Sequence, residues 1–116
     1  MPDLRHTLSK AEKVCSRTDI ARLVRCGVYH SAGCLRFAVL PSPSGMSRIL
    51  VSVPKRNFKR AVKRNLLKRR IREAYRLNKA LLSTPTDILF IYTERELLPF
   101  GEIEKAVRSA LCGIEA

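Results

Sequence analysis

The feature that most constrains this chain is a basic segment, residues 55–76, which reads KRNFKRAVKRNLLKRRIREAYR. Eleven of its 22 residues are Lys or Arg and one is acidic, so the segment carries ten of the chain's thirteen formal net positive charges. No Gly or Pro interrupts it, and Leu, Ala, Arg and Lys all favour helix. We therefore predict a helix from about Phe58 to about Leu82, ended by the breaker at residues 83–85.

Two groups of side chains separate on this predicted helix, at roughly 100° per residue. The apolar group, which we expect to be buried, comprises Leu66, Leu67, Ile71, Ala74, Leu77 and Leu81. The polar group on the opposite arc comprises Arg64, Asn65, Lys68, Arg69, Arg72 and Arg76. Like charges at i, i+4 spacing in this group repel one another and cost the helix stability. A polyanion that neutralises them would offset this cost, so the face predicts nucleic-acid binding.

An acidic protein or a membrane surface are the other partners that such a basic face could take. A helix that lies on a membrane carries Trp or Phe opposite its charges, whereas the opposite face here is Leu and Ile, as in a protein core. No apolar run approaches the roughly 18 residues needed to cross a bilayer. The N-terminal sequence MPDLRHTLSKAEK lacks the apolar centre of a signal peptide, so we expect a cytoplasmic protein without a membrane partner.

The residues that usually carry chemistry are scattered in this sequence. The four cysteines form no CxxC pair and lie near no histidine at ligand spacing, so we expect reduced thiols in small apolar sites. His6 and His30 are isolated, and the acidic residues show no paired spacing. We therefore expect no catalytic residue, bound cofactor or metal site in this chain alone. The four cysteines are Cys15, Cys26, Cys34 and Cys112.

The remaining elements are predicted from periodicity, in a chain long enough for one domain. Residues 1–15 suggest an irregular arm, and a short helix with an Ile20, Leu23 and Val24 stripe follows and ends at Gly27. In the strand predicted at 35–40, odd positions face the core and even positions face a partly open surface. Residues 47–53 form a second strand, which we expect to pair with the first as an antiparallel hairpin.

Two further elements complete the predicted fold. Residues 87–93 are almost wholly apolar, as expected of a strand buried on both faces. Residues 103–111 show the i, i+3, i+4 pattern of an amphipathic helix. With a further short strand near 28–32, the order is αβββαβα, which indicates an α+β two-layer sandwich of a small mixed sheet and three helices.

The basic segment resembles the signature of the bacterial ribonuclease P protein subunit. That signature is Arg64-Asn65 followed by Lys68-Arg69 and Arg72-Glu73, placed just after a strand. The resemblance extends over nearly the whole chain in length and in element order. It implies the fold of the second domain of ribosomal protein S5. It also implies a protein that binds the catalytic RNA subunit of ribonuclease P, which removes the 5′ leader of precursor tRNA with bound Mg²⁺.

The resemblance also implies site residues. The catalytic RNA would contact Arg64, Asn65, Lys68, Arg69 and Arg72, with Lys55 and Arg56 extending the patch. Arg76 is added from the helix itself, because it continues the i, i+4 row of Arg64, Lys68 and Arg72, which we call the ladder. The 5′ leader would lie in a cleft lined by Ile20, Val24, Arg36 and Ala38. Aromatic residues common in the family at three of these places are absent here. Phe37 falls on the opposite face of its strand by alternation, so we expect it in the core.

Three other functions compete with this interpretation. A ribosomal or other structured-RNA-binding protein would need the basic face but no substrate cleft. A DNA-binding regulator would need a short helix before the basic one, where a strand ending at Pro54 is predicted instead, so we expect no DNA partner. An independent enzyme would need an acid–base constellation, which the sequence does not show.

Overall fold

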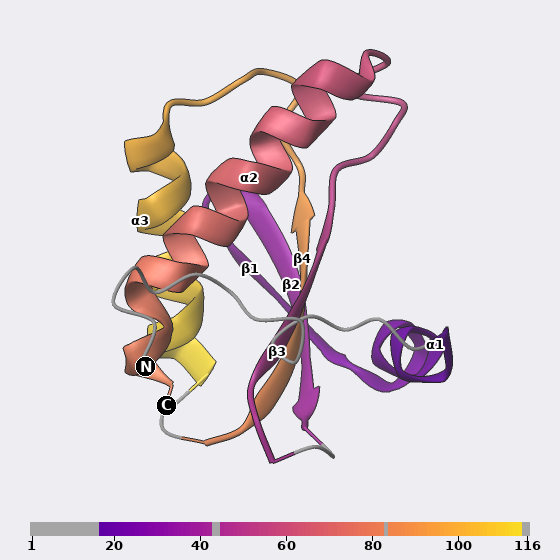
Figure 1. Ribbon diagram of the computed structural model, residues 1–116, viewed down its shortest axis with the longest axis vertical. Helices are drawn as coiled ribbons and strands as arrows, with labels where there is room; N and C mark the ends of the chain where they lie inside the picture. Colours follow the sequence, from indigo (N-terminus) through magenta and orange to yellow (C-terminus); the bar gives the residue numbers. More distant parts are fainter. Residues whose placement is uncertain (1–16, 43–44, 83, 115–116) are drawn as a thin grey trace, which may run out of the picture.

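Figure 1 shows the computed structural model, which describes residues 17–42, 45–82 and 84–114. The expected arm at residues 1–15 lies outside these ranges. The predicted elements are present with shifted ends. In chain order they are α1 (Arg17–Cys26), β1 (Val28–Ala32), β2 (Leu35–Pro41), β3 (Arg48–Ser52), α2 (Ala61–Asn78), the 3₁₀ turn η2 (Lys79–Leu81), β4 (Thr86–Tyr92) and α3 (Phe100–Ile114).

The four strands form one mixed sheet in the order β1-β2-β4-β3. With its three helices, this sheet confirms the predicted α+β class. The predicted hairpin between β2 and β3 is wrong, because β4 lies between them. Phe90 of β4 pairs with Phe37 of antiparallel β2 and with Val51 of parallel β3. A strand that is apolar on both faces gains most at the centre of a sheet, and there it separates the two strands that precede it.

The hairpin of this fold joins β1 to β2 instead. Its turn contains Gly33, whose φ of 55° is a conformation that suits glycine. The register places Tyr29 opposite Ala38. Tyr29 therefore lies on the same face of the sheet as Ala38 and Arg36.

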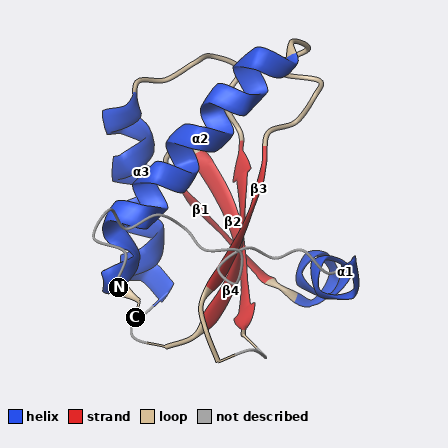
Figure 2. Cartoon of the chain, in the orientation of Figure 1, coloured by secondary structure: helices blue, strands red, loops and turns tan. Residues whose placement is uncertain are grey.

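Helices α2 and α3 cover one face of the sheet and enclose the main core (Figure 2). Phe37 is buried in this core, as predicted. The predicted buried face of α2 is correct at Leu67, Ile71 and Ala74 but wrong towards its C-terminal end. There Leu77 and Leu81 are exposed, and Tyr75 and Asn78 are buried instead. In the N-terminal half, Leu66 is only half-buried.

The position of α3 explains why the buried face of α2 differs from the predicted one. Asn78 donates a hydrogen bond to the Glu104 carboxylate at 3.3 Å and accepts one from Arg108 at 3.3 Å, both on α3. Helix α3 therefore packs on the side of α2 that carries Tyr75 and Asn78. Leu77 and Leu81 are left on the uncovered side.

Helix α1 covers part of the opposite face of the sheet, where it contacts β2 and β4 (Figure 1). Its Leu23 is fully buried with Ala38 and Leu89. The expectation that Ala38 lies on a partly open surface is therefore wrong, since its exposed fraction is 0%. The space is tight as well, because a Cβ on Gly27 would lie 2.9 Å from the Ala38 Cβ. None of the described helices is long and apolar enough to cross a membrane.

Candidate nucleic-acid interface

The basic face of α2 points away from the core. Helix α2 begins at Ala61, three residues later than predicted, because residues 54–60 form a turn. None of the six predicted polar residues on α2 is buried, and Asn65 and Arg69 are exposed. Lys55 and Arg56 are exposed on the turn that leads into the helix.

Most cations of this face lack an acidic partner. Within the described residues, Lys68, Arg69 and Arg72 form no ion pair. Arg76 differs, because its Nε donates to the Glu73 carboxylate at 2.8 Å and its Nη2 contacts the same group. This hydrogen bond from Arg76 lowers the pKa of Glu73. Lys68 and Arg72 in the middle of the ladder therefore present uncompensated charge, while Arg76 at its C-terminal end is partly neutralised.

Arg64 makes contacts that the sequence did not indicate. Its Nη1 donates to the carbonyl oxygens of Phe58 and Lys59, at 2.7 and 2.8 Å. The same turn is closed by a 3.2 Å hydrogen bond from the Asn57 amide to the Pro54 carbonyl. Phe58 anchors it by packing its ring against Tyr92, with the centroids 5.8 Å apart. The guanidinium of Arg64 thus helps to hold the turn that displays Lys55 and Arg56.

Arg70 lies off this face, as its helical position predicts. It is half-buried, and its Nη1 donates to the Leu98 carbonyl oxygen at 2.7 Å. Leu98 belongs to the connection between β4 and α3, so Arg70 ties α2 to its own fold.

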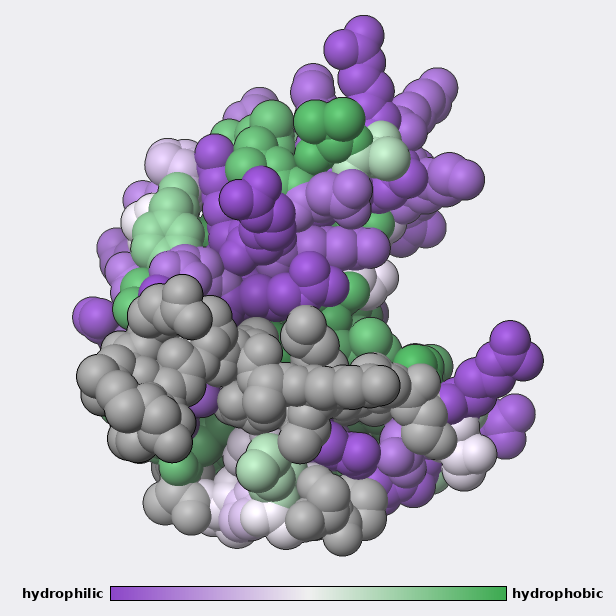
Figure 3. Space-filling model, viewed as in Figure 1, coloured by the Kyte–Doolittle hydropathy of each residue, from purple (hydrophilic) through white to green (hydrophobic). Residues whose placement is uncertain are grey.

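A second candidate surface is the hollow beside α1. Figure 3 shows hydrophobic surface at the back of a hollow that opens between α1 and the connection from β3 to α2. On the sheet face that α1 covers, Leu50 and Ile91 are half-buried and pack against the Leu23 cluster. We call this surface, bounded by α1 and floored by the sheet, the α1 groove.

The predicted cleft residues do not all reach the α1 groove. Val24 is 48% exposed, Arg36 is exposed and Ile20 is half-buried, so these side chains are accessible beside α1. Ala38 is buried beneath the helix and offers no surface.

Tyr29 is the aromatic residue of this region that sequence reasoning missed. The Arg36 guanidinium carbon lies 4.8 Å from the centre of the Tyr29 ring, a cation–π contact. The Tyr29 hydroxyl donates to the Val24 carbonyl oxygen at 2.9 Å and so attaches the end of α1 to the sheet. The β1–β2 hairpin around Gly33 is the signal that would have found it, because that register places Tyr29 beside Ala38.

Comparison with known proteins decides the family. A family model described as Ribonuclease P matches residues 8–115. The chain belongs to the ribonuclease P family. In this family, the Ribonuclease P protein component of Desulforapulum autotrophicum is 34% identical over 86 residues, which are 74% of this chain and 73% of that protein.

Further family members agree in sequence and in fold. The Ribonuclease P protein component of Porphyromonas gingivalis is 45% identical over 75 residues, which are 59% of this chain but only 55% of that protein. The RNase P protein of Thermotoga maritima superposes with a TM-score of 0.79 at 24% identity, covering 90% of this chain and 99% of that one. That of Staphylococcus aureus gives a TM-score of 0.76 at 22% identity, covering 91% and 96%.

Proposed function

We propose that this chain is the protein subunit of a cytoplasmic ribonuclease P ribonucleoprotein, an endoribonuclease that removes the 5′ leader of precursor tRNA. The exposed face of α2 binds the catalytic RNA, and the α1 groove binds the leader. The observation that carries the proposal is the row of uncompensated cations at Lys68, Arg69 and Arg72, set within the family signature. Three adjacent positive charges favour a ligand with regularly spaced phosphates.

The chemistry of cleavage belongs to the RNA in this proposal. The described residues bring together no group of three or more His, Cys, Asp or Glu side chains that could hold a metal ion. In the proposal, Mg²⁺ acts with the RNA partner, and the protein supplies charge and shape. Arg64, Asn65 and the turn carrying Lys55 and Arg56 extend the RNA contact beyond the central cations, and Arg76 completes it.

The α1 groove suits a single strand better than a duplex. Its exposed parts combine apolar side chains, Val24 among them, with the Arg36 guanidinium stacked on Tyr29. Unpaired bases can reach such a surface, whereas in a duplex their faces are stacked on each other. A 5′ leader is single-stranded, so its bases are available to this groove.

Reconstitution tests the proposal. We expect no cleavage of precursor tRNA by the protein alone, and cleavage when the cognate RNA and Mg²⁺ are added. Turnover by rigorously RNA-free protein would overturn the assignment of catalysis to the RNA.

The RNA that co-purifies with the tagged protein tests the choice of partner. One abundant non-ribosomal RNA supports the proposal, whereas ribosomal RNA favours the alternative of a structured-RNA-binding protein without a substrate. The Lys68→Ala/Arg72→Ala double variant is the control, and we expect it to recover less of either RNA.

A further inference from the structure

Helix α1 is held to the sheet by little apolar contact. Leu23 is its one fully buried side chain, whereas α2 and α3 each bury five. Yet α1 forms one wall of the α1 groove, and the accessible Ile20 and Val24 lie on it. Other contacts must therefore fix where this wall lies above the sheet.

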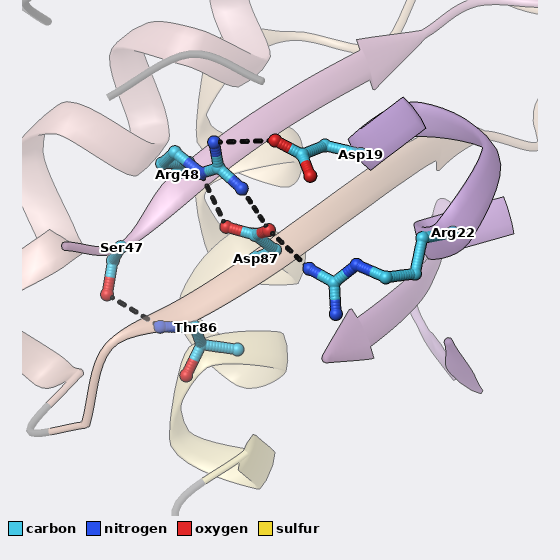
Figure 4. Close-up of polar contacts among 6 residues, drawn as sticks. All are labelled: Asp19, Arg22, Ser47, Arg48, Thr86 and Asp87. Carbon is cyan, nitrogen blue, oxygen red and sulfur yellow. Dashed lines mark hydrogen bonds and ion pairs between the residues drawn. The ribbon is translucent and has the colours of Figure 1, made fainter. Parts of the chain in front are cut away.

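Four charged side chains supply such contacts (Figure 4). Arg48 and Asp87 are register partners on the parallel strands β3 and β4. Arg48 Nε donates to Asp87 Oδ1 at 2.9 Å, and Arg48 Nη2 donates to Asp87 Oδ2 at 2.6 Å. The third nitrogen, Nη1, donates to Asp19 Oδ2 on α1 at 3.1 Å. We call Asp19, Arg22, Arg48 and Asp87 the α1 clamp.

The fourth member of the α1 clamp reaches the sheet from α1 itself. Arg22 Nη2 lies 3.5 Å from Asp87 Oδ2. Beside it the two strands are joined by a 3.1 Å hydrogen bond from the Thr86 amide to the Ser47 hydroxyl (Figure 4). Two links thus run from α1 to the paired strands β3 and β4, one from Asp19 to Arg48 and one from Arg22 to Asp87.

Burial shields the Arg48–Asp87 pair, on which both links from α1 end, while the Asp19 and Arg22 side chains are 25% and 37% exposed. The Asp87 side chain is 0% exposed and that of Arg48 is 12% exposed. Bidentate pairs between Arg and a carboxylate fix geometry as well as distance, and salt screens buried pairs weakly. Two arginines and two aspartates also make the α1 clamp electrically neutral in a chain with a net charge of +13. The clamp therefore adds no net attraction for RNA.

The two ends of α1 are held in different ways. The α1 clamp holds the N-terminal half through Asp19 and Arg22, and the Tyr29 hydroxyl holds the Val24 carbonyl near the C-terminal end. Ile20 lies between Asp19 and Arg22, within the segment that the α1 clamp holds. The position of the groove wall is consequently set by directional polar contacts in addition to the packing of Leu23.

We propose that Arg48 and Asp87 are positioning residues, which hold α1 at the separation from the sheet that admits a single RNA strand. This inference rests on the proposed function, because it assigns the α1 groove to the leader. Arg48 and Asp87 act through α1 and do not themselves contact RNA, since Asp87 is buried and Arg48 nearly so. Loosening the α1 clamp should therefore weaken leader recognition and leave the α2 face intact.

The sharpest variant is Asp19→Ala in the reconstituted holoenzyme. It removes the link from Arg48 to α1 but leaves the bidentate Arg48–Asp87 pair within the sheet. The measurement is the ratio of the dissociation constants for mature tRNA and for leader-bearing precursor, at one salt concentration. We expect this ratio to fall by about tenfold, which corresponds to about 1.4 kcal/mol of binding free energy. The affinity of the protein for the catalytic RNA should stay unchanged.

Charge alone predicts a different result for the same variant. Removing Asp19 makes the protein more positive, which would tighten both tRNA complexes alike and leave the ratio unchanged. Hydrogen exchange provides the second readout, and we expect faster exchange of the α1 amides while those of α3 stay protected. Arg48→Lys should give an intermediate ratio, because one ammonium cannot replace three directed donors. Arg48→Met should lower the ratio further. If Arg48→Met does not fold, the result for Asp19→Ala alone tests the positioning role.

Arg108→Met is the matched control. It removes a polar link between α3 and α2 at 3.3 Å, remote from α1, and should leave the ratio unchanged. If Asp19→Ala speeds exchange in α1 but keeps the wild-type ratio, the positioning role is wrong. It is also wrong if the ratio falls without faster exchange, or if Arg108→Met lowers it equally. A wild-type holoenzyme without any preference for precursor would overturn the proposed function itself.

Discussion

Arg64 reaches back from the first turn of α2 and donates a 2.7 Å hydrogen bond to the carbonyl oxygen of Phe58. Arg64, which the sequence predicts to contact RNA, therefore also stabilises the protein's own fold. Of its five N–H donors, those on Nε and Nη2 remain for a phosphate. The contact links the orientation of α2 to the turn that displays Lys55 and Arg56, so the helix and the turn form one basic surface.

We expect Arg64→Ala to loosen residues 54–60 as well as to remove a charge. Hydrogen bonds to a charged group contribute roughly 1.5–3 kcal/mol, and the partial exposure of Arg64 places its contribution near the lower end. Limited trypsin digestion should cut faster after Lys55, Arg56 or Lys59, as measured by mass spectrometry. Arg69→Ala is the control, because Arg69 makes no such contact within the described residues. Equal cleavage of the two variants would contradict the structural role of Arg64.

The salt dependence of RNA binding tests the α2 face. If about five side chains neutralise phosphates, log affinity should fall with log salt at a slope of roughly −3.5 to −4.5. Lys68→Ala and Arg72→Ala should each make that slope shallower by about one phosphate. Arg70→Ala should change it less, because Arg70 binds the Leu98 carbonyl. The same change for Arg70 and Arg72 would show that the binding face is misassigned.

The thiols should differ in reactivity. Cys26 and Cys112 are exposed, so the expectation that they fill small apolar sites is wrong, while Cys34 is buried and Cys15 lies outside the described residues. Burial raises the pKa of Cys34, so its thiol stays protonated at a pH at which exposed thiols ionise. Iodoacetamide at pH 8 should alkylate Cys26 and Cys112 first, as followed by peptide mass spectrometry. Labelling of Cys34 as fast as Cys112 in folded protein would contradict this order.

Local patterns in the sequence predicted the elements well, because they act over a few residues. The helical period placed Leu67, Ile71 and Ala74 in the core, and the apolar run at 87–93 identified a strand buried on both faces. Sheet order depends on contacts between distant segments. The Pro and Gly residues in the sequence at 41–45 are typical of a turn and so suggested a hairpin, although β4 is the neighbour of both β2 and β3.

The α1 clamp could not be predicted from the sequence for the same reason, since it depends on contacts between distant segments. Asp19, Arg48 and Asp87 are far apart in sequence and have no motif spacing, so only the topology brings them together. The exposure of Leu77 was likewise unpredictable, because it depends on the side on which α3 packs. In contrast, the basic face of α2 is a property of one helix, and its exposure followed from the sequence alone.

Ala38 cannot accept a larger side chain, since it is buried beneath α1 and the Gly27 backbone passes close to it. Adding a ring there to line the groove would displace α1. We expect Ala38→Tyr to lower the free energy of unfolding by roughly 1–3 kcal/mol or more, measured by urea denaturation. Val24→Tyr is the control, because Val24 is half exposed and should tolerate the ring. Wild-type stability of Ala38→Tyr would show that α1 packs more loosely than the contacts imply.

Tyr29 offers the ring that Ala38 cannot. A base stacked on an aromatic side chain contributes roughly 1–3 kcal/mol, and the Tyr29 ring with the Arg36 guanidinium over it lies beside α1. We expect Tyr29→Leu to weaken precursor binding by holoenzyme by an amount in this range and to leave mature tRNA binding unchanged. Tyr29→Phe keeps the ring and removes only the hydrogen bond to Val24, so it should weaken precursor binding less than Tyr29→Leu does. Equal losses in the two variants would mean that the hydroxyl, through its hold on α1, matters and that the ring stacks no base.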